Sequence, residues 1–192
     1  MKNNSERLSD ILSWLDSISY IKTEKIPEVD LYMDQVTSFV DEHLKKTKRS
    51  PEDKALTKTM INNYAKNKLL PPPEKKRYSR EHLLMLIFIY YFKNFLPISD
   101  IKTILGPLTD KYFHKDADLN LEAIYTTLFS KEDTFVQEVL ENVMKQFHMS
   151  ADLFPDAPKA DQASLREFTF ICMLSLDIYL KKQLIEAILD KK

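Results

Sequence analysis

The 192-residue sequence contains almost no glycine. Gly106 is the single one, where average usage of about 7% would give about thirteen. One glycine excludes a Walker A loop and a dinucleotide-binding fingerprint, because each needs several. It also argues against a β-rich fold, since tight hairpins use glycine at positive φ. We therefore expect a mostly helical chain.

Cysteine and histidine are too few or too scattered to build a metal centre. Cys172 is the single cysteine, which excludes an internal disulfide and a cysteine-paired zinc site. The four histidines do not fall at helical ligand spacing. No nucleophile–base pair and no carboxylate pair stands out. We expect no metal, no cofactor and no enzymatic activity, and a buried structural thiol at Cys172.

Long hydrophobic runs are also missing. The two longest, Leu83–Phe92 and Phe168–Leu180, fall short of the roughly 20 residues that a membrane helix needs. They are typical of buried core helices. The polar residues 1–7 do not resemble a signal peptide. With the lone cysteine, these features predict a cytoplasmic protein without a membrane partner.

Charge is sorted along a chain whose net charge is −1. Residues 43–80 contain 12 basic and 3 acidic residues, and the rest of the chain contains 16 basic and 26 acidic residues. Such sorting is typical of a polyanion-binding surface joined to a region that does not bind polyanions. A solvated lysine-rich loop would give the same counts, so charge alone leaves both interpretations open.

Apolar residues recur at helical spacing over most of the chain. The pattern predicts helices over about 5–21, 30–46, 57–68, 80–94, 98–106, 121–128, 131–147 and 164–188. Thr57 and Ser79 are expected N-caps, Gly106-Pro107 an expected helix end, and Ser164-Leu165-Arg166-Glu167 an expected capping box. We expect an N-terminal amphipathic helix within 1–27, a domain over 28–108, and a helical dimerisation or sensing region over 119–192.

The predicted helix 57–68 separates into two faces at 100° per residue. One face is apolar and centres on Tyr64. The other carries Lys58, Thr59, Asn62, Asn63 and Lys66, and it has no acid. Asparagine pairs with adenine in the major groove and lysine with guanine or phosphate. The polar face is therefore a candidate DNA-reading surface, the alternative being an ordinary solvated helix face.

A basic strip follows this helix after three prolines. Its residues are Lys75, Lys76, Arg77 and Tyr78, with Arg80 at the start of the next helix. A short extended hairpin there would form a wing. Its cations are candidate contacts to phosphates or to an adjacent minor groove.

Several short motifs are similar to a known family. They are Thr59-Met60-Ile61-Asn62-Asn63-Tyr64, Lys68-Leu69-Leu70-Pro71, Arg77-Tyr78-Ser79 and Leu96-Pro97-Ile98-Ser99-Asp100-Ile101. Together they resemble the winged-helix head of MerR-type regulators, with Lys68 in place of that pattern's exit glycine. Residues 31–36 and 56–64 are similar to a bacterial family known only as domain of unknown function 1836.

The resemblance implies an all-α, mainly helical fold with a small β wing: a winged helix-turn-helix DNA-binding domain followed by a C-terminal helical bundle. It implies a sequence-specific transcriptional regulator that binds double-stranded DNA. It also implies a C-terminal half that pairs two copies as a homodimer or senses a small-molecule effector, and the apolar surplus of 165–189 favours the homodimer. The alternative is a helical protein-interaction adaptor with a basic partner-binding face.

Overall fold

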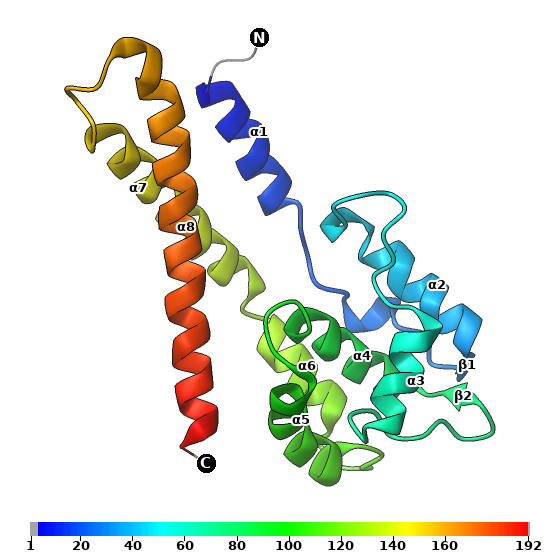
Figure 1. Ribbon diagram of the computed structural model, residues 1–192. Coiled ribbons are helices and arrows are strands. Elements are labelled where there is room, and N and C mark those ends of the chain that lie inside the picture. Colours follow the sequence, from blue (N-terminus) through cyan, green and yellow to red (C-terminus); the bar gives the residue numbers. More distant parts are fainter. Residues whose placement is uncertain (1–3, 192) are drawn as a thin grey trace. The chain divides into compact units, whose positions relative to one another are not determined.

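The computed structural model describes residues 4–191 and divides them into two compact units. One unit comprises residues 18–131, and the other joins residues 4–17 to residues 132–191 (Figure 1). Both units are helical, as the scarcity of glycine predicts. The sheet found among the described residues has two short antiparallel strands.

The unit of residues 18–131 is built around the helix α4. Its elements are η1 (Thr23–Lys25), β1 (Leu31–Tyr32), α2 (Met33–His43), η2 (Lys45–Thr47), α3 (Lys58–Lys66), β2 (Arg77–Tyr78), α4 (Arg80–Phe92), α5 (Ile98–Tyr112) and α6 (Leu121–Phe129). Every residue of α4 from His82 to Tyr90 is buried. A helix that is apolar all round needs such enclosure, so the expected core helix is confirmed.

A two-stranded sheet joins the beginning of α2 to the beginning of α4. Leu31 pairs with Tyr78, and Tyr32 pairs with Arg77. Residues 31 and 32 were expected in the helix 30–46, which instead begins at Met33. A tertiary contact keeps these two residues in a strand, because the pairing buries both Leu31 and Tyr78.

The helix α5 continues through Pro107 to Tyr112, although we expected an end at Gly106-Pro107. A proline inside a helix costs about 3 kcal/mol relative to alanine. The buried residues Ile101 and Leu105 set the packed face of α5 against α4, and the Thr109 hydroxyl lies 3.8 Å from the Met85 sulfur. The packing of this face on α4 therefore offsets the free-energy cost of Pro107 within the helix.

The helix α6 closes the same unit, although the sequence-based region 119–192 included it. The Asn120 side chain caps it by accepting a hydrogen bond from the Ala123 N–H at 2.9 Å. The buried Tyr125 hydroxyl donates to the Ile21 carbonyl at 2.8 Å, and the Tyr20 ring stacks on Phe129. These contacts tie residues 20–21 into the core of this unit.

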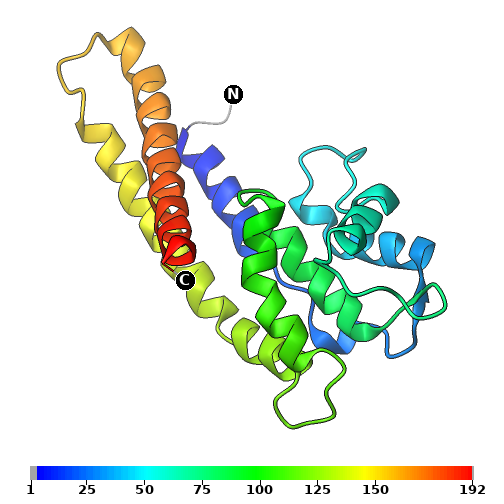
Figure 2. The ribbon, with the colours of Figure 1, turned by 60° about the horizontal axis from the view of Figure 1, so that its bottom comes forward.

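The second unit consists of α1 (Asn4–Asp16), α7 (Glu132–Asp152) and α8 (Lys159–Asp190). α7 and α8 form a long helical hairpin, and α1 packs on α7 (Figures 1 and 2). A groove of about 830 Å³ lies between the three helices and is lined mainly by apolar side chains. None of the helices within residues 4–191 has the length and apolar character needed to span a bilayer.

Three predictions for this unit are wrong. α1 ends at Asp16 rather than near residue 21, because Tyr20 and Ile21 pack into the other unit. α8 begins at Lys159 rather than at Ser164, and the Ser164 hydroxyl donates to the Asp161 carbonyl inside the helix. Cys172 is exposed rather than buried, because it lies on the face of α8 that is turned away from α7.

Candidate nucleic-acid interface

The polar face expected on helix 57–68 is exposed in the structure. Lys58, Thr59, Asn62, Asn63 and Lys66 are all solvent-exposed on α3. The opposite face is buried through Ile61 and Tyr64, and burial raises the pKa of the Tyr64 phenol. Met60 departs from the expected pattern by being exposed. An ion pair links Lys58 to Asp34 of α2, and it is the one carboxylate contact recorded on this face among the described residues.

The start of α3 is fixed by its own cap and by α2. The Thr57 side chain accepts a hydrogen bond from the Met60 N–H at 3.2 Å, which confirms the predicted cap. Two residues earlier, the Ala55 N–H donates to the Asp41 carboxylate at 3.2 Å. The Ala55 carbonyl accepts from the Lys93 ammonium, whose pKa is lowered by burial.

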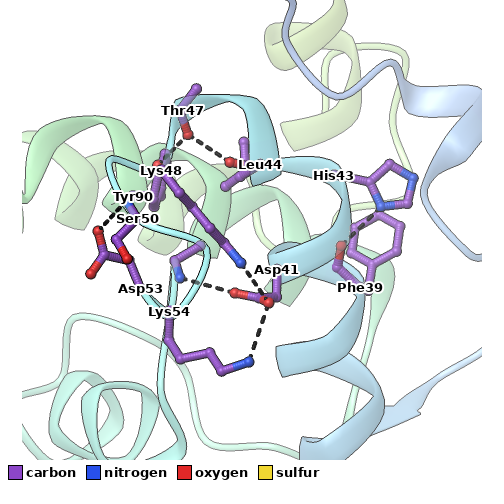
Figure 3. A network of polar contacts seen from close by, with 11 residues as sticks. Phe39, Asp41, His43, Leu44, Thr47, Lys48, Ser50, Asp53, Lys54 and Tyr90 are labelled. Carbon is purple, nitrogen blue, oxygen red and sulfur yellow. Dashed lines mark hydrogen bonds and ion pairs between the residues drawn. The ribbon is translucent and has the colours of Figure 1, made fainter.

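Asp41 organises the long connection between α2 and α3 (Figure 3). Its carboxylate forms an ion pair with Lys48 at 2.6 Å and a longer one with Lys54 at 3.4 Å. The hydrogen bond from Lys48 is the main reason that the pKa of this carboxyl lies below its usual range. The Thr47 hydroxyl adds a 2.5 Å contact to the Tyr90 hydroxyl of the core helix. The loop is therefore tied to both α2 and α4.

The end of α3 is a Schellman motif with lysine at the left-handed position. Lys68 has φ 57°. Its N–H donates to the Ala65 carbonyl at 3.1 Å, and the Leu69 N–H donates to the Tyr64 carbonyl at 2.9 Å. Glycine is the residue usually found at this position. Lys68 is exposed at the end of the polar face, so it extends the candidate surface.

The basic strip forms a tight hairpin, as expected. The Arg77 N–H donates to the Glu74 carbonyl at 2.8 Å, which closes the turn. The two central residues, Lys75 and Lys76, have φ 48° and 64°, as in a type I′ turn. Both side chains are exposed. The Arg77 guanidinium lies 5.4 Å from the centre of the Tyr32 ring.

Two of the candidate residues do not lie on this surface. Tyr78 is buried, because it pairs with Leu31 in the sheet. The Arg80 guanidinium donates twice to the Glu122 carboxylate, each at 2.8 Å. It also donates to the carbonyls of Thr23 and Ile26. Its donors are engaged inside the domain, so phosphate contact is not its structural role.

Sequence reasoning missed Asp41 and Lys68. The signal for Lys68 was present, because Lys68 stands at the exit-glycine position of the resemblance carried by Lys68-Leu69-Leu70-Pro71. Asp41 had a weaker signal, since it stands just before the lysine-rich segment 43–80. Among the described residues, no group of three or more metal-binding side chains is present.

The comparisons with known proteins identify one family. Residues 21–128 match the family described as "Domain of unknown function (DUF1836)". This range contains the whole surface formed by α3 and the hairpin. Neither the curated proteins nor the solved structures gave a significant match to the chain.

Proposed function

Because the chain belongs to the DUF1836 family, whose description assigns no activity, we propose a function from the chain's own surface. The chain acts as a sequence-specific DNA-binding transcriptional regulator of the MerR-like, winged helix-turn-helix type. In this proposal α3 enters the major groove of double-stranded DNA. The hairpin of residues 74–78 contacts the backbone or the minor groove.

The observation that carries this proposal is the composition of the exposed face of α3. Asn62 and Asn63 provide amides that both donate and accept hydrogen bonds, as reading a base edge requires. Lys66 and Lys68 add positive charge at the end of this face, and Lys58, which pairs with Asp34, lies at its beginning. α3 itself contains no acidic residue, so no charge on the helix repels a phosphate.

The hairpin supports the proposal through its strain. A left-handed backbone costs a residue with a Cβ roughly 1–2 kcal/mol, and Lys75 and Lys76 are consecutive residues in that conformation. Asn-Gly would relieve the strain but would remove both charges. Strain of this kind is often kept where it serves a function. Here it places two cations at the tip of a hairpin.

Base reading is tested by the substitutions Asn62→Ala and Asn63→Ala. DNA selected by the purified protein from a random pool supplies the preferred duplex. Each variant should lose roughly 1–3 kcal/mol of affinity for that duplex and little for a scrambled one. Fold stability should barely change, because exposed helix positions tolerate alanine. Asn142→Ala, at an exposed asparagine of the other unit, is the matched control.

Backbone contact is tested by salt titration. Log affinity should fall with log salt by about 0.9 for each phosphate contact. Lys76→Ala and Arg77→Ala should each flatten this slope by about one unit on every sequence. Lys102→Ala, at an exposed lysine of α5, should leave the slope unchanged.

Either titration can also contradict the proposed function. If both asparagine variants keep the ratio of specific to random affinity, α3 is not the reading element. If duplex DNA does not bind at low salt, the proposal is wrong. The basic face would then favour the alternative, a helical adaptor that binds an acidic protein partner.

A further inference from the structure

A pocket lies where the chain turns from α7 into α8, coloured yellow to orange in Figures 1 and 2. Its volume is about 470 Å³, which lies within the range of roughly 300–1,000 Å³ found for small-molecule sites. The end of α7, the connecting loop and the first two turns of α8 line it. All of these residues belong to the second unit, so the pocket is separate from the proposed DNA-binding surface.

The guanidinium of Arg166 lines this pocket without a hydrogen-bonding partner for its Nε. Its Cζ lies 3.9 Å from the centre of the Phe147 ring, and Phe147 is itself held edge-on by Phe170 with centroids 5.4 Å apart. Stacking of this kind does not use the N–H groups of a guanidinium, which lie in its plane. Arg166 Nε is buried and has no hydrogen-bond partner among the described residues. Because a partly buried cation is costly unless it is paired, an anion beside Arg166 would be stabilising.

A second cation lies on the same face of α8. At 100° per residue, Lys159, Gln162 and Arg166 fall within about 60° of one another, and all three line the pocket. The lysines farther along α8, Lys181 and Lys182, pair with carboxylates. Among the described residues, no such pair involves Lys159 or Arg166. The pocket therefore has two cations available to a ligand.

Acidic side chains are kept out of the pocket, although the unit is rich in them. Residues 4–17 and 132–191 contain 7 basic and 14 acidic residues, yet none of the described residues that line the pocket is acidic. Asp161 and Glu167 lie about 140° and 100° around α8 from Arg166. Asp156 is exposed in the loop and does not line the pocket. The lining itself is thus positively charged within an acidic unit.

The loop supplies an apolar wall and is tied to α8. Phe154 and Pro155 line the pocket opposite the polar side chains of α8. The Gln162 side-chain amide donates to the Ala157 carbonyl at 3.0 Å and to the Pro155 carbonyl at 3.5 Å. These hydrogen bonds hold the loop beside the cations. The pocket therefore offers an anion-binding side and an apolar side to one ligand.

We propose that this pocket binds a small organic oxyanion, a carboxylate or a phosphate monoester with an apolar body. The planar fork of Arg166 matches either head group through two N–H donors, and Lys159 adds a mobile positive charge. The apolar body contacts Phe154 and Pro155. This binding does not depend on the proposed DNA binding, and each is measured without the other.

The first test is calorimetric titration of the full chain with four probes: benzoate, phenyl phosphate, neutral benzamide and inorganic phosphate. At least one of the two organic anions should bind, with one site per chain, and the tighter of the two identifies the head group. Benzamide should bind at least about tenfold more weakly, because it lacks the charge that strengthens the hydrogen bonds. Inorganic phosphate should also bind more weakly, because it has no apolar body.

Three results of this titration overturn the proposal. Absence of binding by both organic anions at millimolar concentration shows that the pocket is not an oxyanion site. Equal affinity for benzamide shows that charge is not recognised. Equal affinity for inorganic phosphate shows that the apolar wall has no part in binding.

The second test places the ligand through side-chain substitutions. Arg166→Gln should weaken binding of the organic anion by about tenfold or more, and Arg166→Lys, which keeps the charge but loses the fork, by several-fold. Lys159→Gln should also weaken it, with unchanged circular dichroism, because Lys159 is exposed. This variant keeps the test decisive if Arg166→Gln disturbs the packing on Phe147. Lys145→Gln, at an exposed lysine of α7 outside the pocket, is the matched control and should bind as the wild type does.

The third test separates this pocket from the basic hairpin, which also attracts anions. Lys76→Ala should leave binding of the organic anion unchanged, and Lys159→Gln should leave DNA binding unchanged. If Lys76→Ala or Lys145→Gln weakens anion binding as much as Lys159→Gln does, the anion binds elsewhere or without a defined site, and the proposal is wrong. A chain that does not bind DNA but loses the organic anion in Lys159→Gln would contradict only the proposed function.

Discussion

Residues 18–131 enclose their large apolar side chains, whereas the unit of residues 4–17 and 132–191 leaves many of its own in solvent. Among the described residues, the buried apolar core belongs to the first unit except for Leu8. In the second unit, aromatic and branched side chains of all three helices are about half exposed, among them Trp14, Phe135 and Phe168. Residues 18–131 therefore form a closed core within one chain, and the second unit does not.

The comparison has an energetic meaning. Burial of apolar surface contributes about 25 cal/mol per Å², so the first unit obtains most of its stability from its own core. The second unit keeps much of that surface exposed, so its own core contributes less to its stability. Trp14, the single tryptophan, lies in α1 and reports on the second unit by fluorescence.

The largest expected effect concerns a buried aromatic side chain. Tyr64 is 5% exposed, whereas Phe154, in the loop between α7 and α8, is 46% exposed. Tyr64→Ala should lower the free energy of unfolding of residues 18–131 by about 3–5 kcal/mol, and Phe154→Ala should change that of the second unit by less than about 1 kcal/mol. Urea titrations followed by circular dichroism and by Trp14 fluorescence should separate the two. Equal losses in the two units would show that burial of these side chains does not distinguish them.

The next effect is an acid sensitivity confined to the first unit. Burial, assisted by the nearby His114 and opposed by the carbonyls of Pro72 and Pro71 and by Asp30, lowers the pKa of His82 to about 4. Below pH 6.5, His82 is protonated in the unfolded chain, whereas in the folded chain it stays neutral down to a pH of about 4. Stability should therefore fall as the pH drops from 6.5 to 4, by up to roughly 3 kcal/mol.

The variant His82→Gln isolates this effect. His82 Nδ1 accepts a hydrogen bond from the Ser79 N–H at 3.0 Å, and glutamine preserves the capping box. Urea titrations at several pH values should show a smaller loss of stability in the variant between pH 6.5 and 4. An identical pH dependence in the two proteins would exclude His82 as the cause.

A smaller effect concerns the loop that positions α3. Asp41→Asn removes the charge that pairs with Lys48 but keeps an acceptor for the Ala55 N–H. It should destabilise residues 18–131 by about 1 kcal/mol at pH 7. Because the folded-state pKa of Asp41 is lowered, the difference should disappear as the pH falls through that folded-state pKa, below 3.8. Asp110→Asn, at an exposed acid of α5, should show no such difference.

The smallest expected effect is a gain in stability. Lys68 has a left-handed backbone, and glycine adopts this conformation without strain. Lys68→Gly should raise the unfolding free energy of residues 18–131 by about 0.5–1 kcal/mol, measured by thermal melts. Lys66→Gly, at the last helical residue of α3, should lower it instead. A loss in both variants would show that the Lys68 side chain stabilises the fold.

The sequence correctly predicted the features that depend on residues close together along the chain. The exposed face of α3, its Thr57 cap and the buried length of α4 all follow from a 3.6-residue period and from cap chemistry, which act within one or two turns. The position of the hairpin followed from three prolines and a basic strip. These features are the ones that define the candidate surface.

The rest depends on contacts that no local pattern contains. Pairing of Leu31 with Tyr78 joins residues far apart in the sequence through strands of two residues each. Continuation of α5 through Pro107 depends on its packed face. The internal role of Arg80 depends on Glu122 and on the carbonyls of Thr23 and Ile26. A basic residue beside a basic strip looks the same in sequence whether it contacts solvent or a carboxylate of its own domain.

The order of the units along the chain has a consequence for synthesis. Residues 18–131 are inserted between α1 and the helices α7 and α8 that complete its unit. At ~5–20 residues per second, α1 leaves the ribosome roughly ten seconds before α7 does. During that interval the inserted domain can fold alone, while Leu8, Ile11 and Trp14 have no partner helix. α1 is therefore most exposed to aggregation and to chaperones before α7 and α8 are translated.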